Sequence, residues 1–593
     1  MVRAVTPIPF VKARFFDRCG KPLAGGKVYT YEANTTTPKV TYKDPYGLTP
    51  NTNPIILDAA GEADIYLDGT YRIRITDRND VLVNDAAKIG SWFSDNLQDT
   101  LDNISGAMDD AINTAAAAGA GANGWTDTLI AVSENINQRQ INDGLESVAQ
   151  LAGIQNPHNG MRVFVKSYHY GLNKGGGTFV YDSAKASVND GVVNFGGWVR
   201  SSFMFVTSFM AGCKADVVTD DTVAFQRGVD YTAQNKFPFY VDEGVHYLNT
   251  CNFIRWNTEH QFQTYCPIIE LKYSGITVLG LSKKSVLKYG DSITTSVQAG
   301  INEYGYVGAQ LFSSNPSVKI DDFTLDGVTI DGNGYNNKII GVNQGGYGSA
   351  AGNQAVALQY GDRTTIRNNV FKDLSGYQVL YIAYDVKETL VEGNEFIDAG
   401  WLDGTNWVGN YTDQSTVYLG GTFLARNNRI SQSHDGMYAG TAFEMHGIGT
   451  VVGNHIQKYA CAFLTAGSVR NPDTKILANT AIDCTMFLST YQGYEKSVKC
   501  TAIGNYFRQN TMYLSESTVY GKYRGLIFLS GDYSPLSCKV HILSNTIETD
   551  GAYVGSTDAY LKKYNSLIMM QHVNEFIFKG NIVKNHKGSM LKL

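Results

Sequence analysis

A short phrase built around an asparagine recurs along the second half of the chain. Four copies are clear, IRNNVF, VEGNEF, ARNNRI and VVGNHI, and four weaker ones follow, ILANTA, AIGNYF, ILSNTI and FKGNIV. The asparagines they share are Asn369, Asn394, Asn428, Asn454, Asn479, Asn505, Asn545 and Asn581, which stand 25, 34, 26, 25, 26, 40 and 36 residues apart. A repeat of this length and regularity indicates a solenoid.

A unit of this length with short strand runs cannot bury its own apolar face, so it must stack on its neighbours. An asparagine at the same turn of every coil can bond to the asparagines above and below it, as in the ladders of stacked strands. The repeat therefore predicts an all-β fold, a parallel β-helix. The longer gaps then mark inserted loops, which are where function usually lies in a repeat protein.

Composition excludes several classes of protein. At 593 residues the chain is too long for one core, and its 55 acidic against 49 basic residues, with no basic run, argue against nucleic acid as a ligand. The eight cysteines form no CxxC pair, and no histidine cluster has zinc spacing, so we expect reduced, buried cysteines, no metal and no cofactor. The start lacks the apolar stretch of a secretory signal, and no run has transmembrane length. We therefore expect synthesis in a cytoplasm and no membrane insertion.

The pattern along the chain predicts four zones. Residues 1–95 read as a compact β-rich module, 96–124 as a helical neck and hinge, 125–212 as a connector, and 213–593 as the β-helix. In the neck, the spacing of Leu97, Leu101, Ile104, Met108 and Ile112 predicts either a coiled-coil seam or a helix packed on its own domain.

The connector and the start of the β-helix each contain one predicted helix. The connector is expected to open with a helix over residues 133–151 and to continue with short strands around a glycine turn. In the fourth zone, Asp220 or Asp221 can cap a helix with Val223, Ala224, Phe225 and Val229 on its apolar face. Such a helix would cover the open end of the β-helix.

Three segments together resemble phage tailspikes. VTDDTVAFQRGVD, followed by FYVDEGVHYL, resembles the opening of pectate-lyase-like tailspike domains; MRVFVKSYHYGLNKGGGTFVYD is similar to a segment that precedes it in podovirus tailspikes and capsule depolymerases. ARFFDRCGKPLAGGKVYTYEANTTTPKVTYKD is similar to their particle-attachment modules. The resemblance implies a right-handed, pectin-lyase-like β-helix in a homotrimer on the virion, made in the host cytoplasm. It also implies attachment to a phage tail or adaptor protein through residues 1–95, and binding and cleavage of a bacterial surface polysaccharide.

Alternation along the strands selects the candidate site. In TAFEMHG, Phe443 and Met445 must face inward, so Glu444 and His446 face outward together. Glu444 stands ten residues before its asparagine, as Tyr418 and Gln359 do before theirs, which predicts one column. In LYIAYDVKE, alternation puts two residues, Tyr381 and Asp385, on one face and two, Ile382 and Tyr384, on the other. We expect Tyr381, Asp385, Tyr418, Glu444 and His446 to share one outward face within reach of Asp435.

Glycosidic hydrolysis generally needs two carboxyl groups. Glu444 paired with Asp435 or Asp385 is the preferred catalytic pair; His446 would orient the acid or bind substrate, or else be an ordinary surface histidine. An outward carboxylate on a solenoid can equally be solvated surface.

The 34-residue gap holds the insertion DAGWLDGTNWVGNYTDQS. Its aromatic rings can stack on sugar faces and its acids can bond hydroxyls, which makes substrate-binding candidates of Trp401, Trp407, Tyr411, Asp403 and Asp413, beside Tyr381 and Tyr418. The two aspartates are also reserve catalytic candidates. The alternative is that the tryptophans anchor the loop on its own coil or at a subunit interface.

Three functions fit the sequence. The first is a tailspike endoglycosidase that hydrolyses a capsular or O-antigen polysaccharide. The second is a polysaccharide lyase acting on a uronate, which needs a base such as His, Lys or Tyr and a group that neutralises the carboxylate. The third is a non-catalytic adhesin.

Overall fold

A computed structural model describes most of the chain. The described residues are 6–7, 12–90, 104, 107–109, 111, 131–133, 136–137, 143–201, 203–251, 254–255, 264–293, 309–337, 353–376, 378–403, 415–433, 437–467, 470–492, 496–510, 526–530, 537–549 and 566–592. They belong to two compact units, 1–125 and 126–593. Among the described residues, no helix is long and apolar enough to cross a membrane.

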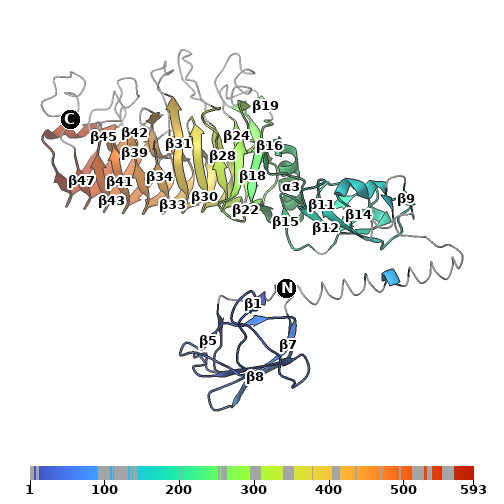
Figure 1. Cartoon of the computed structure of the whole chain (residues 1–593). Helices are drawn as coiled ribbons and strands as arrows, with labels where there is room; N and C mark the ends of the chain where they lie inside the picture. The colour runs from blue at the N-terminus through green and yellow to red at the C-terminus, as the bar shows by residue number, and fades with distance from the viewer. Residues whose placement is uncertain are drawn as a thin grey trace. The chain divides into compact units, whose positions relative to one another are not determined.

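The first unit contains a small antiparallel sheet in the order β4-β3-β7-β8 (Figure 1). Its strands are β4 (Ile55–Ile56), β3 (Lys27–Glu32), β7 (Thr70–Thr76) and β8 (Leu82–Gly90). Alternate residues such as Val28, Tyr71 and Ile73 face one buried core, as alternation along a half-buried strand requires.

Only five helical residues of the predicted neck are described, at positions 104, 107–109 and 111. Ile104 and Met108 are 48% and 41% exposed, which fits a seam that packs against other helices. Leu97, Leu101 and Ile112 of the predicted seam lie outside the described residues.

The first part of the second unit contains a four-stranded antiparallel sheet in the order β11-β12-β14-β13. The strands are β11 (Arg162–Ser167), β12 (Gly175–Tyr181), β14 (Trp198–Arg200) and β13 (Asn194–Phe195). The prediction of a helix over 133–151 is wrong, because this stretch holds two short strands and a 3-10 turn, β9 (Ala131–Ser133), β10 (Ile136–Asn137) and η1 (Val148–Gly153). Gly144, at φ +88°, leaves the helical region.

The rest of the second unit is a parallel β-helix with three faces (Figure 1). A typical coil runs through β36 (Thr441–Met445), β37 (Ile448–Val452) and β38 (His455–Gln457), and the next coil repeats this with β39 (Cys461–Gly467), β40 (Asp473–Leu477) and β41 (Thr480–Cys484). Each strand pairs in parallel with its counterpart one coil on. We call the faces built by β36, β37 and β38 and their counterparts sheets I, II and III. The predicted parallel β-helix is confirmed.

The helix α3 (Thr222–Asn235) covers the first coil, as predicted. Ala224, Phe225 and Val229 are buried in the core of the β-helix, whereas Val223 is exposed. Asp221 is the N-cap residue but its side chain makes no capping bond, and it is Asp220 whose Oδ1 accepts the Thr222 amide at 3.0 Å.

The asparagine ladder is continuous through all eight predicted positions. Each ladder asparagine from Asn369 to Asn545 donates its backbone N–H and its Nδ2–H to the Oδ1 of the next, at 2.8 to 3.1 Å. The ladder lies in the turn between sheets II and III. The residue before each ladder asparagine has positive φ, which explains the glycine or asparagine found there in six of the eight copies.

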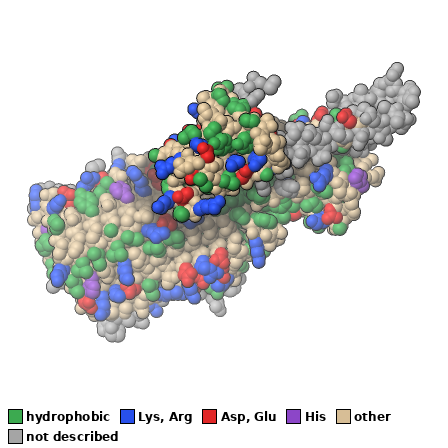
Figure 2. All heavy atoms as spheres, turned by 90° about the horizontal axis from the view of Figure 1, so that it is seen from below, with side chains coloured by type: hydrophobic (Ala, Val, Ile, Leu, Met, Phe, Trp, Pro, Cys, Tyr) green, Lys and Arg blue, Asp and Glu red, His purple; other side chains and the backbone are tan. Residues whose placement is uncertain are grey.

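The surface of the β-helix carries charges of both signs. Ion pairs join neighbouring coils, such as Arg363 with Asp322 at 2.6 Å and Arg426 with Glu392 at 2.6 Å. Figure 2 shows positive and negative side chains interspersed on the face seen from below. Six of the eight cysteines are buried, whereas Cys251 is half-buried and Cys19 is exposed, so the prediction of buried cysteines fails at the latter.

Candidate functional site

Three side chains form a column on the outer side of sheet I. Tyr381 of β30 (Leu380–Glu392) pairs with Tyr418 of β32 (Ser415–Leu419), which pairs with Glu444 of β36. Their neighbours in sequence, such as Phe443 and Met445, fill the interior. The predicted column is correct for these three residues and wrong for Gln359, because Ala357 pairs with Tyr381.

Glu444 and His446 form a close pair at the end of β36. His446 Nε2 lies 2.7 Å from Glu444 Oε1, and the two residues are each only 6% exposed. They point away from the interior, as predicted, but the expectation that they face solvent freely is wrong. The Tyr418 ring stacks on the His446 ring with centroids 4.6 Å apart, and the Tyr384 ring meets it edge-on at 5.7 Å.

Tyr384 is the residue that alternation along the strand misplaced. It was expected to face inward, but an extra residue in β30 between Ile382 and Asp385 breaks the register with β28 (Gln354–Arg367). This bulge reverses the alternation and turns Tyr384 outward. Its hydroxyl lies 3.4 Å from His446 Nδ1 and accepts a hydrogen bond from the Tyr418 hydroxyl.

These contacts join a carboxylate, an imidazole and two phenols into one polar network. Burial, and then the neighbouring tyrosines and Glu444, raise the pKa of Tyr418 well above its ordinary value. Its phenol therefore stays protonated at neutral pH and can donate. A linked set of this kind can transfer a proton and can donate hydrogen bonds to a sugar.

Glycines allow neighbouring coils to approach closely beside this network. A Cβ on Gly420 would stand 2.7 Å from the Tyr384 amide nitrogen. A Cβ on Gly421 would clash with the Val386 carbonyl oxygen, and one on Gly447 with the Gly421 carbonyl oxygen. In the sequence, the glycines of the segments YLGG and EMHG are the signal that could have revealed this close approach of neighbouring coils.

Replacing Gly421 with alanine should therefore disturb the site. We expect a loss of about 2–3 kcal/mol in stability from overpacking. The matched control is Gly504→Ala, where φ is +67° and no atom lies within 4 Å of the new Cβ. This control should cost about 1 kcal/mol. Chemical unfolding of both variants checks the difference, and equal losses would contradict it.

Asp385, the second predicted carboxylate, lies one residue beyond the bulge. Its side chain is exposed and pairs with Arg470, Nη2 to Oδ1, at 2.5 Å. The sequence did not reveal Arg470, which comes from the segment between β39 and β40, three coils on from Asp385, and is distant in sequence from the other residues. The site thus has a cation at its margin, although no basic cluster is visible in the sequence.

Two of the candidates from the inserted loop, Trp401 and Asp403, lie among the described residues. Trp401 of β31 (Glu395–Asp403) is completely buried, with the Tyr335 ring 5.9 Å away, so the expectation of an exposed sugar-stacking Trp401 is wrong and the anchoring alternative fits. The backbone of Asp403 pairs with Met437 of β35 (Met437–Ala439). The remaining candidates lie outside the described residues: Trp407, Tyr411, Asp413 and Asp435.

Comparison with known proteins gives one match to a family. Residues 144–203 match the phage tail protein small four-stranded beta-sheet domain. This range contains the four-stranded sheet β11-β12-β14-β13. No curated protein matches the chain.

Several solved structures are similar to the chain. The tailspike protein of an Acinetobacter phage is 13% identical, with a TM-score of 0.43, 74% of this chain covered and 70% of that one. The tailspike protein of E. coli bacteriophage HK620, in complex with a pentasaccharide, is 13% identical, with a TM-score of 0.44 and coverage of 69% and 70%. The Streptococcus pneumoniae surface protein and adhesin PfbA is 14% identical, with a TM-score of 0.40 and coverage of 65% and 99%.

Proposed function

We propose that this protein is a phage tailspike that binds a bacterial surface polysaccharide, a capsule or O-antigen, and cleaves it on the outer side of sheet I. The observation that carries the proposal is the Glu444–His446 pair, bonded at 2.7 Å and enclosed by tyrosine rings on the outer side of a β-helix. The phage tail domain matched at residues 144–203 supports a place in the virion tail.

The proposed reaction is hydrolysis of a glycosidic bond. Glu444 donates a proton to the leaving oxygen, and His446, through its Nε2 contact with Oε1, orients the carboxyl and restores its proton. A second carboxylate activates water, and Asp385 and Asp435 are the candidates. Tyr381 and Tyr418 offer ring faces and hydroxyls to the sugar.

The test is to incubate the purified full-length protein with surface polysaccharides from a panel of bacteria. Hydrolysis produces new reducing ends without the absorbance of unsaturated uronates. Binding without any cleavage product would leave an adhesin as the function and contradict the proposal.

A polysaccharide lyase is the second candidate, and two observations favour it. The Tyr384 hydroxyl lies 3.4 Å from His446 Nδ1, which provides a base and an acid for β-elimination, and Arg470 is a cation that could neutralise a uronate carboxylate. Hydrolysis and elimination differ in whether the Tyr384 hydroxyl must transfer a proton to the substrate.

Replacing Tyr384 with phenylalanine separates the two reactions. Under hydrolysis the lost hydroxyl is not a proton donor to substrate, so we expect a change in kcat of less than about tenfold. If the reaction is elimination, the Tyr384 hydroxyl does donate a proton to the substrate, and kcat should fall by about 10²–10⁴-fold without it. Steady-state kinetics of Tyr384→Phe, with unsaturated products monitored in the same samples, checks this. A large fall in kcat would contradict hydrolysis by Glu444 as the main reaction.

The remaining parts of the chain have proposed roles in assembly. Residues 1–95 would attach the spike to a phage tail or adaptor protein, and the exposed Ile104 and Met108 would join three copies through the neck. Light scattering of the full chain and of a version without residues 1–124 tests the assembly through the neck. Cleavage by the shorter version tests the attachment role, because a loss of cleavage would contradict a purely attaching role.

A further inference from the structure

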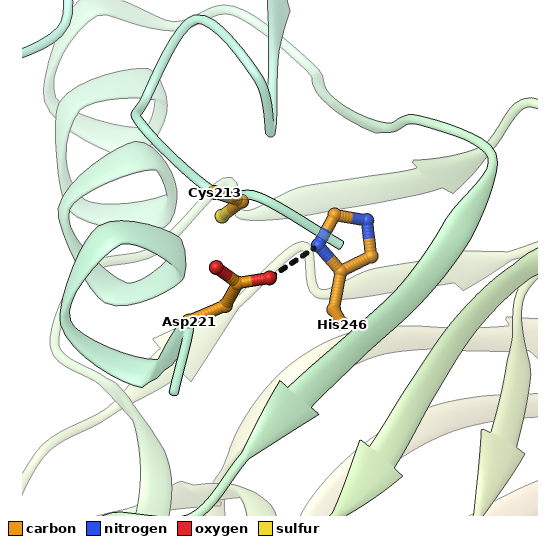
Figure 3. A group of neighbouring side chains, drawn as sticks. All are labelled: Cys213, Asp221 and His246. Atoms are coloured by element: carbon orange, nitrogen blue, oxygen red, sulfur yellow. Dashed lines mark ion pairs between the residues drawn. The ribbon is translucent and has the colours of Figure 1, made fainter. Parts of the chain in front are cut away.

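A second cluster of reactive side chains lies at the N-terminal end of the β-helix. Cys213 follows β15 (Val206–Thr207), Asp221 precedes α3, and His246 lies in β18 (Gly244–Leu248). Their donor atoms lie within 4.8 Å of one another, and all three side chains are buried (Figure 3). The cluster is separate from the outward network on sheet I, and the function proposed above does not use it.

Asp221 is held in place by the backbone. Its Oδ1 accepts the Lys214 amide at 2.7 Å, and its Oδ2 accepts the Ala215 amide at 2.8 Å. The carboxylate is therefore fixed, with Oδ2 facing the His246 ring at 3.4 Å from Nδ1. Both amides belong to the turn that follows Cys213, so the cysteine is positioned by the same contacts.

The other nitrogen of His246 identifies the tautomer. Nε2 lies 3.3 Å from the Asp242 carbonyl oxygen and 3.3 Å from Ser208 Oγ. Ser208 donates its hydroxyl proton to Asp242 Oδ2 at 3.0 Å, so Nε2 must be the donor to the carbonyl oxygen. In neutral His246, Nδ1 then carries a lone pair.

This lone pair has no hydrogen-bond partner, although Nδ1 is buried. It faces a carboxylate oxygen, which is another acceptor, and the cysteine sulfur. Two acceptors facing each other in the interior repel unless a positive charge lies between them. Either a proton on His246 or a metal ion can supply that charge.

We propose that Cys213, Asp221 and His246 bind a zinc ion that fastens the end cap of the β-helix. Sulfur, nitrogen and oxygen donors in one site suit zinc. Ligands at zinc distances stand about 3.5 Å apart, so the cluster needs only a small contraction. The surroundings match those of metal sites, where the ligating histidine donates its other N–H to a carbonyl and the carboxylate is itself hydrogen-bonded.

The site would join three separate elements at the end of the β-helix. One ligand comes from the turn before β16 (Asp216–Asp220), one from the start of α3 and one from β18, which pairs with β16 in sheet III. Binding releases the thiol proton of Cys213, because zinc takes the thiolate. The sequence did not predict this site, because its donors stand at positions 213, 221 and 246, without the spacing of a zinc motif.

Metal analysis of the full-length protein tests the proposal. The protein is stripped with a chelator, loaded with zinc sulfate and desalted, and its zinc content is measured by mass spectrometry. We expect one zinc ion per chain in the wild type and in Cys461→Ala, which removes another buried cysteine. Cys213→Ala should bind zinc about 100-fold more weakly or worse, and zinc should raise the melting temperature of the wild type and of Cys461→Ala but not that of Cys213→Ala.

Cobalt(II) provides a second measurement that does not depend on a variant. A thiolate-to-cobalt absorption band in the wild type would support the site even if Cys213→Ala failed to fold. A folded wild type that retains no zinc and shows no band would overturn the proposal and leave a buried Asp221–His246 ion pair. Equal zinc content in a folded Cys213→Ala variant would also overturn it.

Discussion

Asn428→Ala is expected to destabilise the β-helix by about 3–5 kcal/mol, because three buried groups each lose a partner at about 1–3 kcal/mol. The Asn428 Oδ1 accepts both the backbone N–H and the Nδ2–H of Asn394, each at 3.0 Å, and its Nδ2 donates to the Val391 carbonyl at 2.9 Å. Alanine cannot replace any of these bonds, and the tightly stacked coils leave little room for water.

The preceding residue provides a matched control. Asn427 is exposed, has φ 56° and lies outside the ladder. Glycine adopts this conformation without strain, so Asn427→Gly should change stability by less than about 1 kcal/mol. Midpoints of guanidinium chloride unfolding, at equal protein concentration, compare the two variants. If Asn428→Ala were no less stable than Asn427→Gly, the ladder would contribute nothing measurable.

The second large effect is expected on cleavage, from the substitution Glu444→Gln. It should lower the rate of polysaccharide cleavage by about 10²–10⁴-fold, because an amide cannot donate a proton as a carboxylic acid does. In the wild type, Glu444 Oε1 lies 2.7 Å from His446 Nε2. The glutamine amide has nearly the same shape as the carboxyl group and can still bond to this nitrogen. Binding of polysaccharide and the unfolding midpoint should therefore change little.

Glu395→Gln is the control for this substitution. Glu395 begins β31 in sheet III, away from the outward network on sheet I. Cleavage by this variant should equal that of the wild type, measured as reducing ends released per unit time. Full cleavage by Glu444→Gln would show that another group supplies the proton.

The fold was readable from the sequence because the solenoid repeats one local rule. From Asn369 to Asn581, each coil has a residue with positive φ followed by a ladder asparagine, so a single phrase marks each of these turns. The column Tyr381, Tyr418 and Glu444 was predictable for the same reason, since strands in register preserve alternation from coil to coil.

The details of the site depend on departures from that rule. The bulge in β30 turns Tyr384 outward, and no periodicity reveals a single extra residue. Trp401 was misplaced because the insertion that contains it is rich in polar residues, whereas Tyr335 and Gly334 from another coil lie against it. Arg470 and the Cys213–Asp221–His246 cluster combine residues from separate coils or turns, so only the folded structure brings them together.

The most direct test of the proposed site is a crystal structure of Glu444→Gln with an oligosaccharide of its polysaccharide substrate. We predict sugar rings against Tyr381 and Tyr384, with a glycosidic oxygen within hydrogen-bonding distance of the side chain at position 444. An oligosaccharide that is ordered on another face of the β-helix and makes no contact with residue 444, His446 or Tyr384 would contradict this account.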